Sequence, residues 1–85
     1  MSFTKPVRVV DLELLETVRK LYCLCCLKTP CDSHHVRSRG AGGGDTWDNV
    51  MPLCSEHHRL WHLKGQAFMA KEFPAVLHWL EMAEA

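Results

Sequence analysis

The chain has 85 residues, with 10 Lys and Arg against 10 Asp and Glu, so its formal net charge at pH 7 is zero. A chain of this length allows one domain, residues 1–85, and buries too little apolar surface to be comfortable without a cross-link such as a metal ion. The zero net charge argues against a strong nonspecific nucleic-acid binder.

The cysteines and the apolar residues indicate the compartment. The chain has five Cys, an odd number. We find no charged-then-apolar signal segment at the N-terminus and no apolar run near the 18 or so residues that span a bilayer. The sequence therefore predicts a reducing, cytoplasmic location with no membrane, where clustered cysteines are more often metal ligands than disulfides.

Residues 1–22 are predicted to form an arm followed by a helix. Residues 1–9 read as a loose or extended lead. From Val10 to Tyr22, apolar residues recur at helical spacing, with acidic side chains early and basic side chains late, as the helix dipole favours. We expect this amphipathic helix to cover the back of the core; binding of a partner protein is the alternative.

Residues 23–33 predict a metal-binding turn. Cys23 and Cys26 form a Cys-x2-Cys pair, which is typical of a zinc knuckle. Cys25 is an alternative ligand, although the spacing favours Cys23 with Cys26. Cys31 is expected to be a buried thiol under the hairpin that follows.

The stretch from Arg37 to Asp45 predicts a glycine-rich hairpin loop, whose backbone can approach a ligand closely. Arg37 and Arg39 either clamp a phosphate beside an ion, because a guanidinium fork suits two phosphate oxygens, or are solvated loop charges. Trp47 is predicted to plug the hairpin rather than to stack on a base.

The next segment predicts a helix that carries metal ligands on two faces. If Ser55 caps this helix, each residue advances by about 100° around the axis. Cys54 and His57 then share one face, and His58 and His62 share another, roughly a quarter turn away. One helix can therefore serve two ions.

Two metal sites follow, because these ligands are too many for one tetrahedral ion. The first is a closed structural zinc site with the ligands Cys23, Cys26, Cys54 and His57. The second is open, with the ligands His34, His58 and His62. It keeps positions for water and a substrate oxygen, as a catalytic ion requires. In an extended segment His35 points away from its neighbour, and it is left over as a general base.

The C-terminal part, residues 65–85, predicts two short helices. Lys64-Gly65 is expected to end the metal-binding helix with a left-handed cap. Residues 66–73 and 74–82 then form helices, with Pro74 opening the second. We expect their apolar residues to pack on the core, with a homodimer interface as the alternative, and His78 to lie at the surface or its boundary.

The order of these motifs resembles that of the HNH endonuclease family, and in particular small HNH proteins of phages and prophages. The resemblance covers residues 23–62 and rests on His34-His35, Asn49 and His58-x3-His62, interleaved with the Cys-x2-Cys and Cys-x2-His pairs. It implies an α+β fold, in which residues 23–64 form a ββα-metal, treble-clef-like hairpin and helix with flanking helices. It also implies a phage-encoded or bacterial cytoplasmic protein.

The resemblance further implies residue roles. In that family, the second His of the pair activates water and the Asn steadies the hairpin loop, so His35 would be the general base and Asn49 the organiser. The ion held by His34, His58 and His62 would assist hydrolysis of DNA phosphodiesters to 5′ phosphate products. An all-imidazole ligand set favours Mn, Co, Ni or Zn over Mg, although the family often works with Mg.

Basic residues outnumber acidic ones around the predicted metal sites, and three other functions are compatible with parts of the pattern. Residues 19–64 hold seven Lys and Arg against four Asp and Glu, so modest DNA affinity is expected near the metal sites. The first rival is a noncatalytic zinc module that binds nucleic acid or a protein. The second is a metalloprotease, in which Arg59 stands where the motif requires glutamate. The third is a metal-dependent toxin or scaffold in a phage assembly machine.

Overall fold

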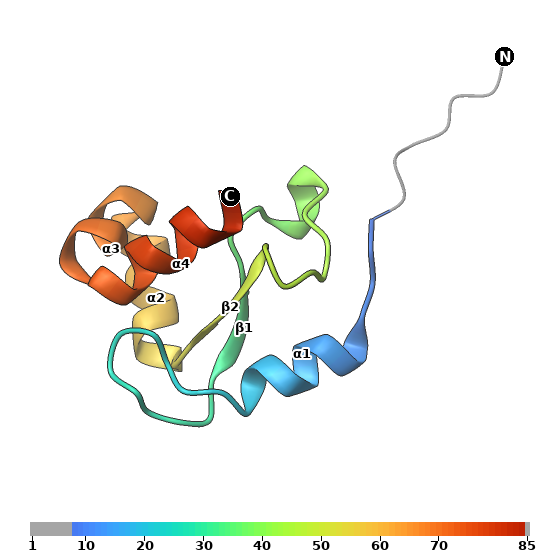
Figure 1. Cartoon of the computed structure of the whole chain (residues 1–85), viewed down its shortest axis with the longest axis horizontal. Coiled ribbons are helices and arrows are strands. Elements are labelled where there is room, and N and C mark those ends of the chain that lie inside the picture. The colour runs from blue at the N-terminus through green and yellow to red at the C-terminus, as the bar shows by residue number, and fades with distance from the viewer. Residues whose placement is uncertain (1–7, 85) are drawn as a thin grey trace, which may run out of the picture.

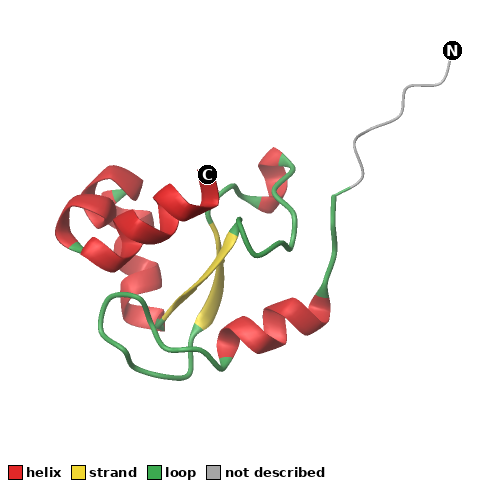
Figure 2. Ribbon diagram, in the orientation of Figure 1, coloured by secondary structure: helices red, strands yellow, loops and turns green. Residues whose placement is uncertain are grey.

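A two-stranded antiparallel hairpin lies at the centre of the fold. The computed structural model describes residues 8–84. The hairpin consists of β1 (Asp32–His35) and β2 (Val50–Leu53). Figure 1 shows α1 (Leu12–Arg19) on one side of this hairpin and α2 (Ser55–Lys64), α3 (Gln66–Glu72) and α4 (Pro74–Glu84) on the other. The described residues thus form the small α+β fold that the sequence predicts, with a single hairpin among helices (Figure 2).

The register of the hairpin determines which side each histidine faces. His34 pairs with Met51 and His35 pairs with Val50. Successive side chains of a strand point to opposite faces. Ser33, which shares a face of β1 with His35, donates from Oγ to the Leu15 carbonyl of α1 at 2.8 Å. On the other face, the centroid of the His34 ring lies 4.4 Å from that of the Trp61 ring of α2. The two neighbouring histidines are therefore directed to different surroundings.

Helices pack on both sides of the hairpin, and all four residues of β2 are buried. One cluster joins three residues of α1 to Val50, and its members are Leu14, Leu15, Val18 and Val50. A larger cluster joins β2 to α2, α3 and α4, and includes Met51, Leu53, Trp61, Met69, Val76 and Leu80. The prediction that the N-terminal helix covers the back of the core is confirmed by its contacts with both strands.

The first helix is shorter than the predicted span from Val10 to Tyr22, and that prediction is wrong at both ends. Asp11 is the N-cap, and its carboxylate accepts from the Leu14 amide at 3.0 Å. At the other end, the Cys31 amide donates to the Arg19 carbonyl at 2.9 Å, which turns the chain toward the cysteines. Val10 and Tyr22 consequently lie exposed outside the helix.

The helix that carries the candidate ligands begins one residue earlier than a cap at Ser55 would place it. Cys54 has extended backbone angles and is the N-cap, so Ser55 is the first helical residue and not the cap. The Cys54 side chain makes no capping hydrogen bond. The helix ends at Lys64 as predicted. Gly65 has a positive φ of 87°, but its ψ of 169° differs from that of a left-handed cap. The last two helices nearly match the predicted spans.

Within residues 8–84, every helix is too short or too polar to cross a bilayer. His78 is exposed, in agreement with the predicted surface position. Cys31 is buried in the larger cluster beside β1, as expected.

Candidate metal centres and the adjoining groove

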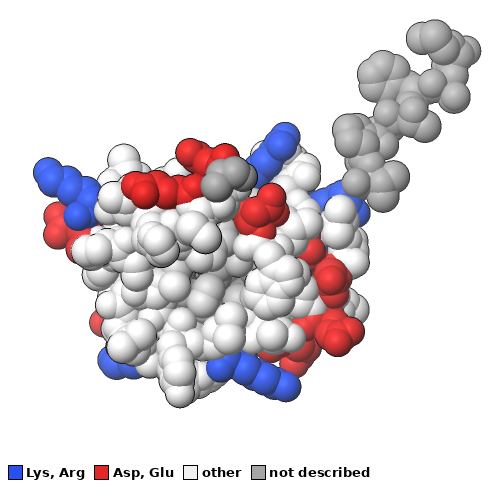
Figure 3. Space-filling model, in the orientation of Figure 1, with Lys and Arg blue, Asp and Glu red and all other residues white. Residues whose placement is uncertain are grey.

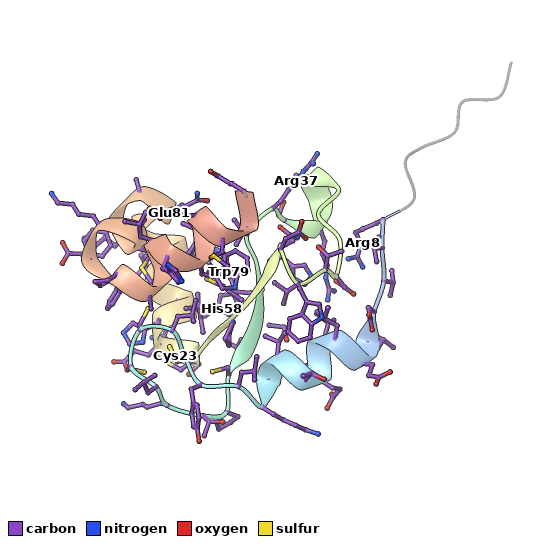
Figure 4. All side chains as sticks on the ribbon, viewed as in Figure 1. Arg8, Cys23, Arg37, His58, Trp79 and Glu81 are labelled. Atoms are coloured by element: carbon purple, nitrogen blue, oxygen red, sulfur yellow. The ribbon has the colours of Figure 1, made fainter. Side chains whose placement is uncertain are left out.

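The first group of metal ligands lies between the turn at residues 23–28 and the start of α2. It consists of the four predicted residues Cys23, Cys26, Cys54 and His57, whose ligand atoms all lie within 4.8 Å of one another. Cys54 Sγ lies 3.2 Å from His57 Nδ1, and Cys26 Sγ lies 3.7 Å from Cys54 Sγ. These side chains are close enough to hold a metal ion. In Figure 4, Cys23 lies beside the beginning of α2.

Backbone amides favour the thiolate form of Cys23. The Cys25 amide donates a hydrogen bond to Cys23 Sγ at 3.4 Å. Burial raises the pKa of the Cys23 thiol, but hydrogen bonds from backbone amides, of Cys54 first and then of Cys25 and Cys26, outweigh burial, and the net shift lowers that pKa. A thiolate is the form that binds metal. The turn closes through Leu27, a non-glycine residue with a φ of 64°.

The two remaining cysteines lie outside this group. Burial raises the pKa of the Cys25 thiol to about 12 and that of the Cys31 thiol to about 11. Both groups are therefore neutral thiols at physiological pH. The selection of Cys23 and Cys26, rather than Cys25, is the one that the Cys-x2-Cys spacing predicts.

The second group of ligands consists of His34 on β1 and of His58 and His62, one turn apart on α2, with ligand nitrogens within 4.8 Å of one another. The Nε2 atoms of His58 and His62 lie 3.2 Å apart. The His34 ring is 5.0 Å from the His58 ring and 5.7 Å from the His62 ring, centroid to centroid. Three imidazoles thus converge on one point beside the hairpin.

The burial and the unpaired Nε2 of His34 suit a metal ligand. Its side chain is 3% exposed, and its Nε2 is the one buried side-chain nitrogen or oxygen in residues 8–84 without a hydrogen-bond partner. A buried polar atom without a partner is costly, so such an atom calls for an explanation. Burial, and then the neighbouring His58 and His62, lower the pKa of His34 to about 3. The ring is therefore neutral at pH 7, which is the form that binds metal.

Asp32 orients one ligand and was not predicted from the sequence. Its Oδ2 lies 2.9 Å from His58 Nδ1, so the other ring nitrogen of His58 is left free to face His62. Carboxylates commonly hold metal-binding histidines in this way. Strand alternation could have indicated Asp32 from the sequence, because Asp32 and His34 lie two residues apart and share one face of β1.

A groove of about 440 Å³ lies over the three imidazoles. Its lining consists of Ser33, His34, His35, Ser38, Arg39, Gly40, His58 and His62. Of the two predicted phosphate-binding arginines, the structure brings Arg39 to this groove. Arg37 instead donates from Nε to the Ala41 carbonyl at 2.9 Å and so holds its own loop. Arg37 also lies apart from His58 in Figure 4.

His35 lies at the groove and pairs with a buried carboxylate that sequence reasoning missed. His35 Nε2 is 2.7 Å from Asp45 Oδ1, and Asp45 is 2% exposed. Arg8 Nη1 donates to the same oxygen at 3.0 Å, and the Asp11 amide donates to Oδ2 at 2.9 Å. The hydrogen bond with His35 is the largest cause that lowers the pKa of Asp45; burial opposes it, and Asp11 and Arg8 add to the lowering.

Asn49 bridges the two ends of the hairpin loop, as the family resemblance implies for this position. Its Oδ1 accepts from the Arg37 amide at 2.8 Å, and its Nδ2 donates to the carbonyls of Arg37 and Gly44 at 3.1 and 2.9 Å. The loop is so tight that a Cβ on Gly43 would lie 1.8 Å from the Arg37 carbonyl oxygen. Glycine is therefore required at Gly43 by close backbone approach.

The prediction that Trp47 plugs the hairpin is wrong. Its side chain is 59% exposed and lies between two shallow surface depressions, one against Asp11 and Leu14 of the α1 end and one against Trp79 and Met82 of α4. The hydrogen bonds of Asn49 and the close approach of Gly43 to the Arg37 carbonyl close the loop instead. On the face seen in Figure 3, acidic side chains gather at the upper edge and at the right, around a largely uncharged centre.

Comparisons with protein-family models, with curated proteins and with solved structures found no match to this chain. The functional assignment therefore rests on the two ligand groups, the groove and the residues around His35.

Proposed function

We propose that this chain is a metal-dependent endonuclease of the HNH type, which hydrolyses phosphodiester bonds of DNA. The observation that carries the proposal is the convergence of three imidazoles, from His34, His58 and His62, in a groove that His35 also lines. Three protein ligands in an open groove leave coordination positions for water and substrate. A hairpin followed directly by the ligand-bearing helix is also the order of a ββα-metal unit.

The first ligand group fits a structural zinc ion. A tetrahedral ion with bonds of zinc length separates two sulfurs by about 3.8 Å and a sulfur from a nitrogen by about 3.6 Å. The separations here are 3.7 Å for Cys26 and Cys54, 3.7 Å for Cys23 and His57, and 3.2 Å for Cys54 and His57. Four protein ligands leave no position for substrate, which suits a structural role in a small core.

The second ligand group would hold the hydrolytic ion. When bound, a divalent ion supplies Lewis-acid stabilisation of the phosphate and of the leaving oxygen. His34, His58 and His62 would hold it, with Asp32 maintaining the orientation of the His58 ring. The orphaned Nε2 of His34 supports this assignment, because a ligand bond would satisfy it.

The remaining groove residues supply the proton transfer and the positioning. His35 takes the proton from the attacking water as general base. Arg39 lies on the groove, where its guanidinium can contact phosphate oxygens; Arg37 and Asn49 hold the loop that presents it. Arg59 is exposed on α2 and offers no general base, which disfavours peptide hydrolysis at the same ion.

A supercoiled plasmid incubated with the purified protein tests the proposal directly. Mg, Mn, Co, Ni and Zn are each added, and nicked and linear products are separated on a gel. We expect cleavage with at least one of these ions. His35→Ala should lose cleavage while it retains both metal ions, since this side chain is in neither ligand group.

The matched control is His78→Ala, which removes an exposed histidine of α4 and should cut at the wild-type rate. If the wild type binds DNA but cuts it with none of the five ions, the endonuclease proposal fails. The noncatalytic zinc module then replaces it, because the first ligand group alone would support such a module.

A further inference from the structure

Asp45 is a buried carboxylate that gathers three donors from two distant parts of the chain. His35 on β1 approaches Oδ1 at 2.7 Å, Arg8 donates to the same oxygen at 3.0 Å, and the Asp11 amide donates to Oδ2 at 2.9 Å. No side-chain area of Asp45 is exposed. A fully satisfied buried carboxylate is rigid, because any rotation would break hydrogen bonds that water cannot replace.

The segment before α1 holds this carboxylate in place. The Asp45 amide donates to the Val9 carbonyl at 2.8 Å, and Arg8 Nη1 reaches the Gly43 carbonyl at 3.3 Å. A Cβ on Gly44 would lie 3.1 Å from Val9 Cβ, so the two segments are in close contact. Figure 4 shows Arg8 on this segment, on the side of the hairpin loop. Residues 8–11 therefore lock the loop that carries Asp45.

The pairing specifies which ring nitrogen of His35 carries hydrogen. A carboxylate only accepts hydrogen bonds, so in a neutral His35 ring the hydrogen is on Nε2. Nδ1 is then the atom with the free lone pair. Nε2 makes the one side-chain hydrogen bond of His35 within residues 8–84, and His35 is one of the residues that line the groove. A general base must present an unprotonated nitrogen to its substrate.

We propose that Asp45 is the positioning residue for His35: it holds the imidazole in its Nε2–H tautomer, so that Nδ1 is the proton-accepting atom at the groove. Arg8 and the Asp11 amide keep the carboxylate in place, which makes residues 8–11 part of the hydrolytic apparatus. This inference rests on the proposed endonuclease function. Asp45 itself does not line the groove, and it acts only through His35.

Asparagine cannot replace this carboxylate, although it has nearly the same shape. One amide orientation points its NH2 at the Asp11 amide, which is itself a donor. The other points its NH2 at Arg8 and His35, where the guanidinium clashes as a donor and His35 Nε2 must become an acceptor. The second orientation moves the His35 hydrogen to Nδ1. Asp45→Asn therefore distinguishes a tautomer-setting carboxylate from a mere space filler.

The first measurement is independent of nuclease activity. Long-range ¹⁵N–¹H correlation spectra of the zinc-loaded protein, at a mildly alkaline pH where imidazoles are neutral, distinguish the two tautomers of each histidine. The spectrum of His35→Gln identifies the His35 signals by their loss. We expect a single Nε2–H tautomer for His35 in the wild type. An Nδ1–H tautomer would overturn the inference even if the protein cuts DNA.

The second measurement is plasmid cleavage by Asp45→Asn. We expect kcat to fall about 100-fold with KM unchanged, because the base is misaligned while the groove is intact. The His35 signals should shift toward the Nδ1–H tautomer, and zinc content should match the wild type. Asp48→Asn makes the same chemical change at an exposed position three residues away and should leave kcat unaltered.

The possible results separate this inference from the proposed function. Wild-type kcat in a folded Asp45→Asn protein overturns the inference and leaves the endonuclease proposal intact. Absence of any cleavage by the wild type refutes the function, and comparison of the wild-type and Asp45→Asn spectra still decides whether Asp45 sets the tautomer. If Asp45→Asn loses its zinc and does not fold, the inference about Asp45 is decided by the tautomer of the wild type and by the kcat of Arg8→Ala. Arg8→Ala keeps the carboxylate and should retain the Nε2–H tautomer with a smaller loss of kcat than 100-fold.

Discussion

The Nε2 atoms of His58 and His62 lie 3.2 Å apart, one turn from each other on α2. His57 of the same helix and Cys54, its N-cap, instead lie against the turn at residues 23–28. A single helix therefore contributes ligands to two groups that do not share a side chain, so each group can be removed without touching the ligands of the other.

Removing one ligand of the cysteine group should unfold the protein. Metal binding in small zinc modules supplies folding free energy on the order of 10 kcal/mol, so we expect Cys54→Ser to lose its helical circular-dichroism signal and its zinc. Cys25→Ser is the matched control, because this cysteine lies in the same turn but outside the ligand group. A folded, metal-free Cys54→Ser protein would contradict the structural role of the site.

Removing one ligand of the histidine group should cost one ion and leave the fold. His58→Ala should retain the zinc of the cysteine group, keep its circular-dichroism spectrum and lose the second equivalent of metal in elemental analysis. The physical reason is that His58 is partly exposed and the hairpin is held by apolar clusters on both sides. Loss of both ions together would show that the two groups are coupled.

Truncating Asn49 should weaken the loop and slow cleavage. Three hydrogen bonds from its amide to the backbone at Arg37 and Gly44 are lost, which should destabilise the fold by roughly 1–3 kcal/mol. We expect Asn49→Ala to remain folded with a cleavage rate about 100-fold lower, since the loop carries Arg39 and Asp45. Urea denaturation and plasmid cleavage measure the two effects. Unchanged turnover would make Asn49 an ordinary turn residue.

A methyl group at Gly43 should be far more costly than one at Gly40. The Cβ of Gly43→Ala would overlap the Arg37 carbonyl oxygen at 1.8 Å, so the loop must open, at a cost of about 2 kcal/mol or more. A Cβ at Gly40 meets nothing within 4 Å, and Gly40→Ala should change stability by no more than about 0.5 kcal/mol. The two alanine variants are compared by urea denaturation. Equal stability of both would contradict the close approach at Gly43.

Relieving the strained backbone at Leu27 should stabilise the protein. Leu27 has a φ of 64° and is 71% exposed, so its side chain contributes little packing. The left-handed conformation costs an L-residue roughly 1–2 kcal/mol, and the greater chain entropy of glycine offsets roughly 0.5–1 kcal/mol of the gain. Leu27→Gly should therefore raise the free energy of unfolding by up to about 1 kcal/mol. Leu27→Ala keeps the Cβ and the strain, and it should show no such gain.

Ligand types, their spacing and the helix that presents them were predictable from the sequence alone. A 3.6-residue period is a local property of the backbone, so the direction shared by Cys54 and His57 was expected to differ by roughly a quarter turn from that of His58 and His62. Strand alternation likewise separated His34 from His35. Gly65 and Pro74 marked the ends of helices because their effects on backbone angles are local as well.

Only the tertiary structure decided the partners of these residues. Asp45 meets Arg8 across 37 positions of sequence, and no periodicity links two segments that meet only when the loop packs on the chain before α1. The same packing closed the loop on Gly43 and left Trp47 exposed, although an indole in isolation favours burial. It also directed Arg39 to the groove and Arg37 to its own loop, because two exposed arginines two residues apart differ only in what the folded chain places beside them.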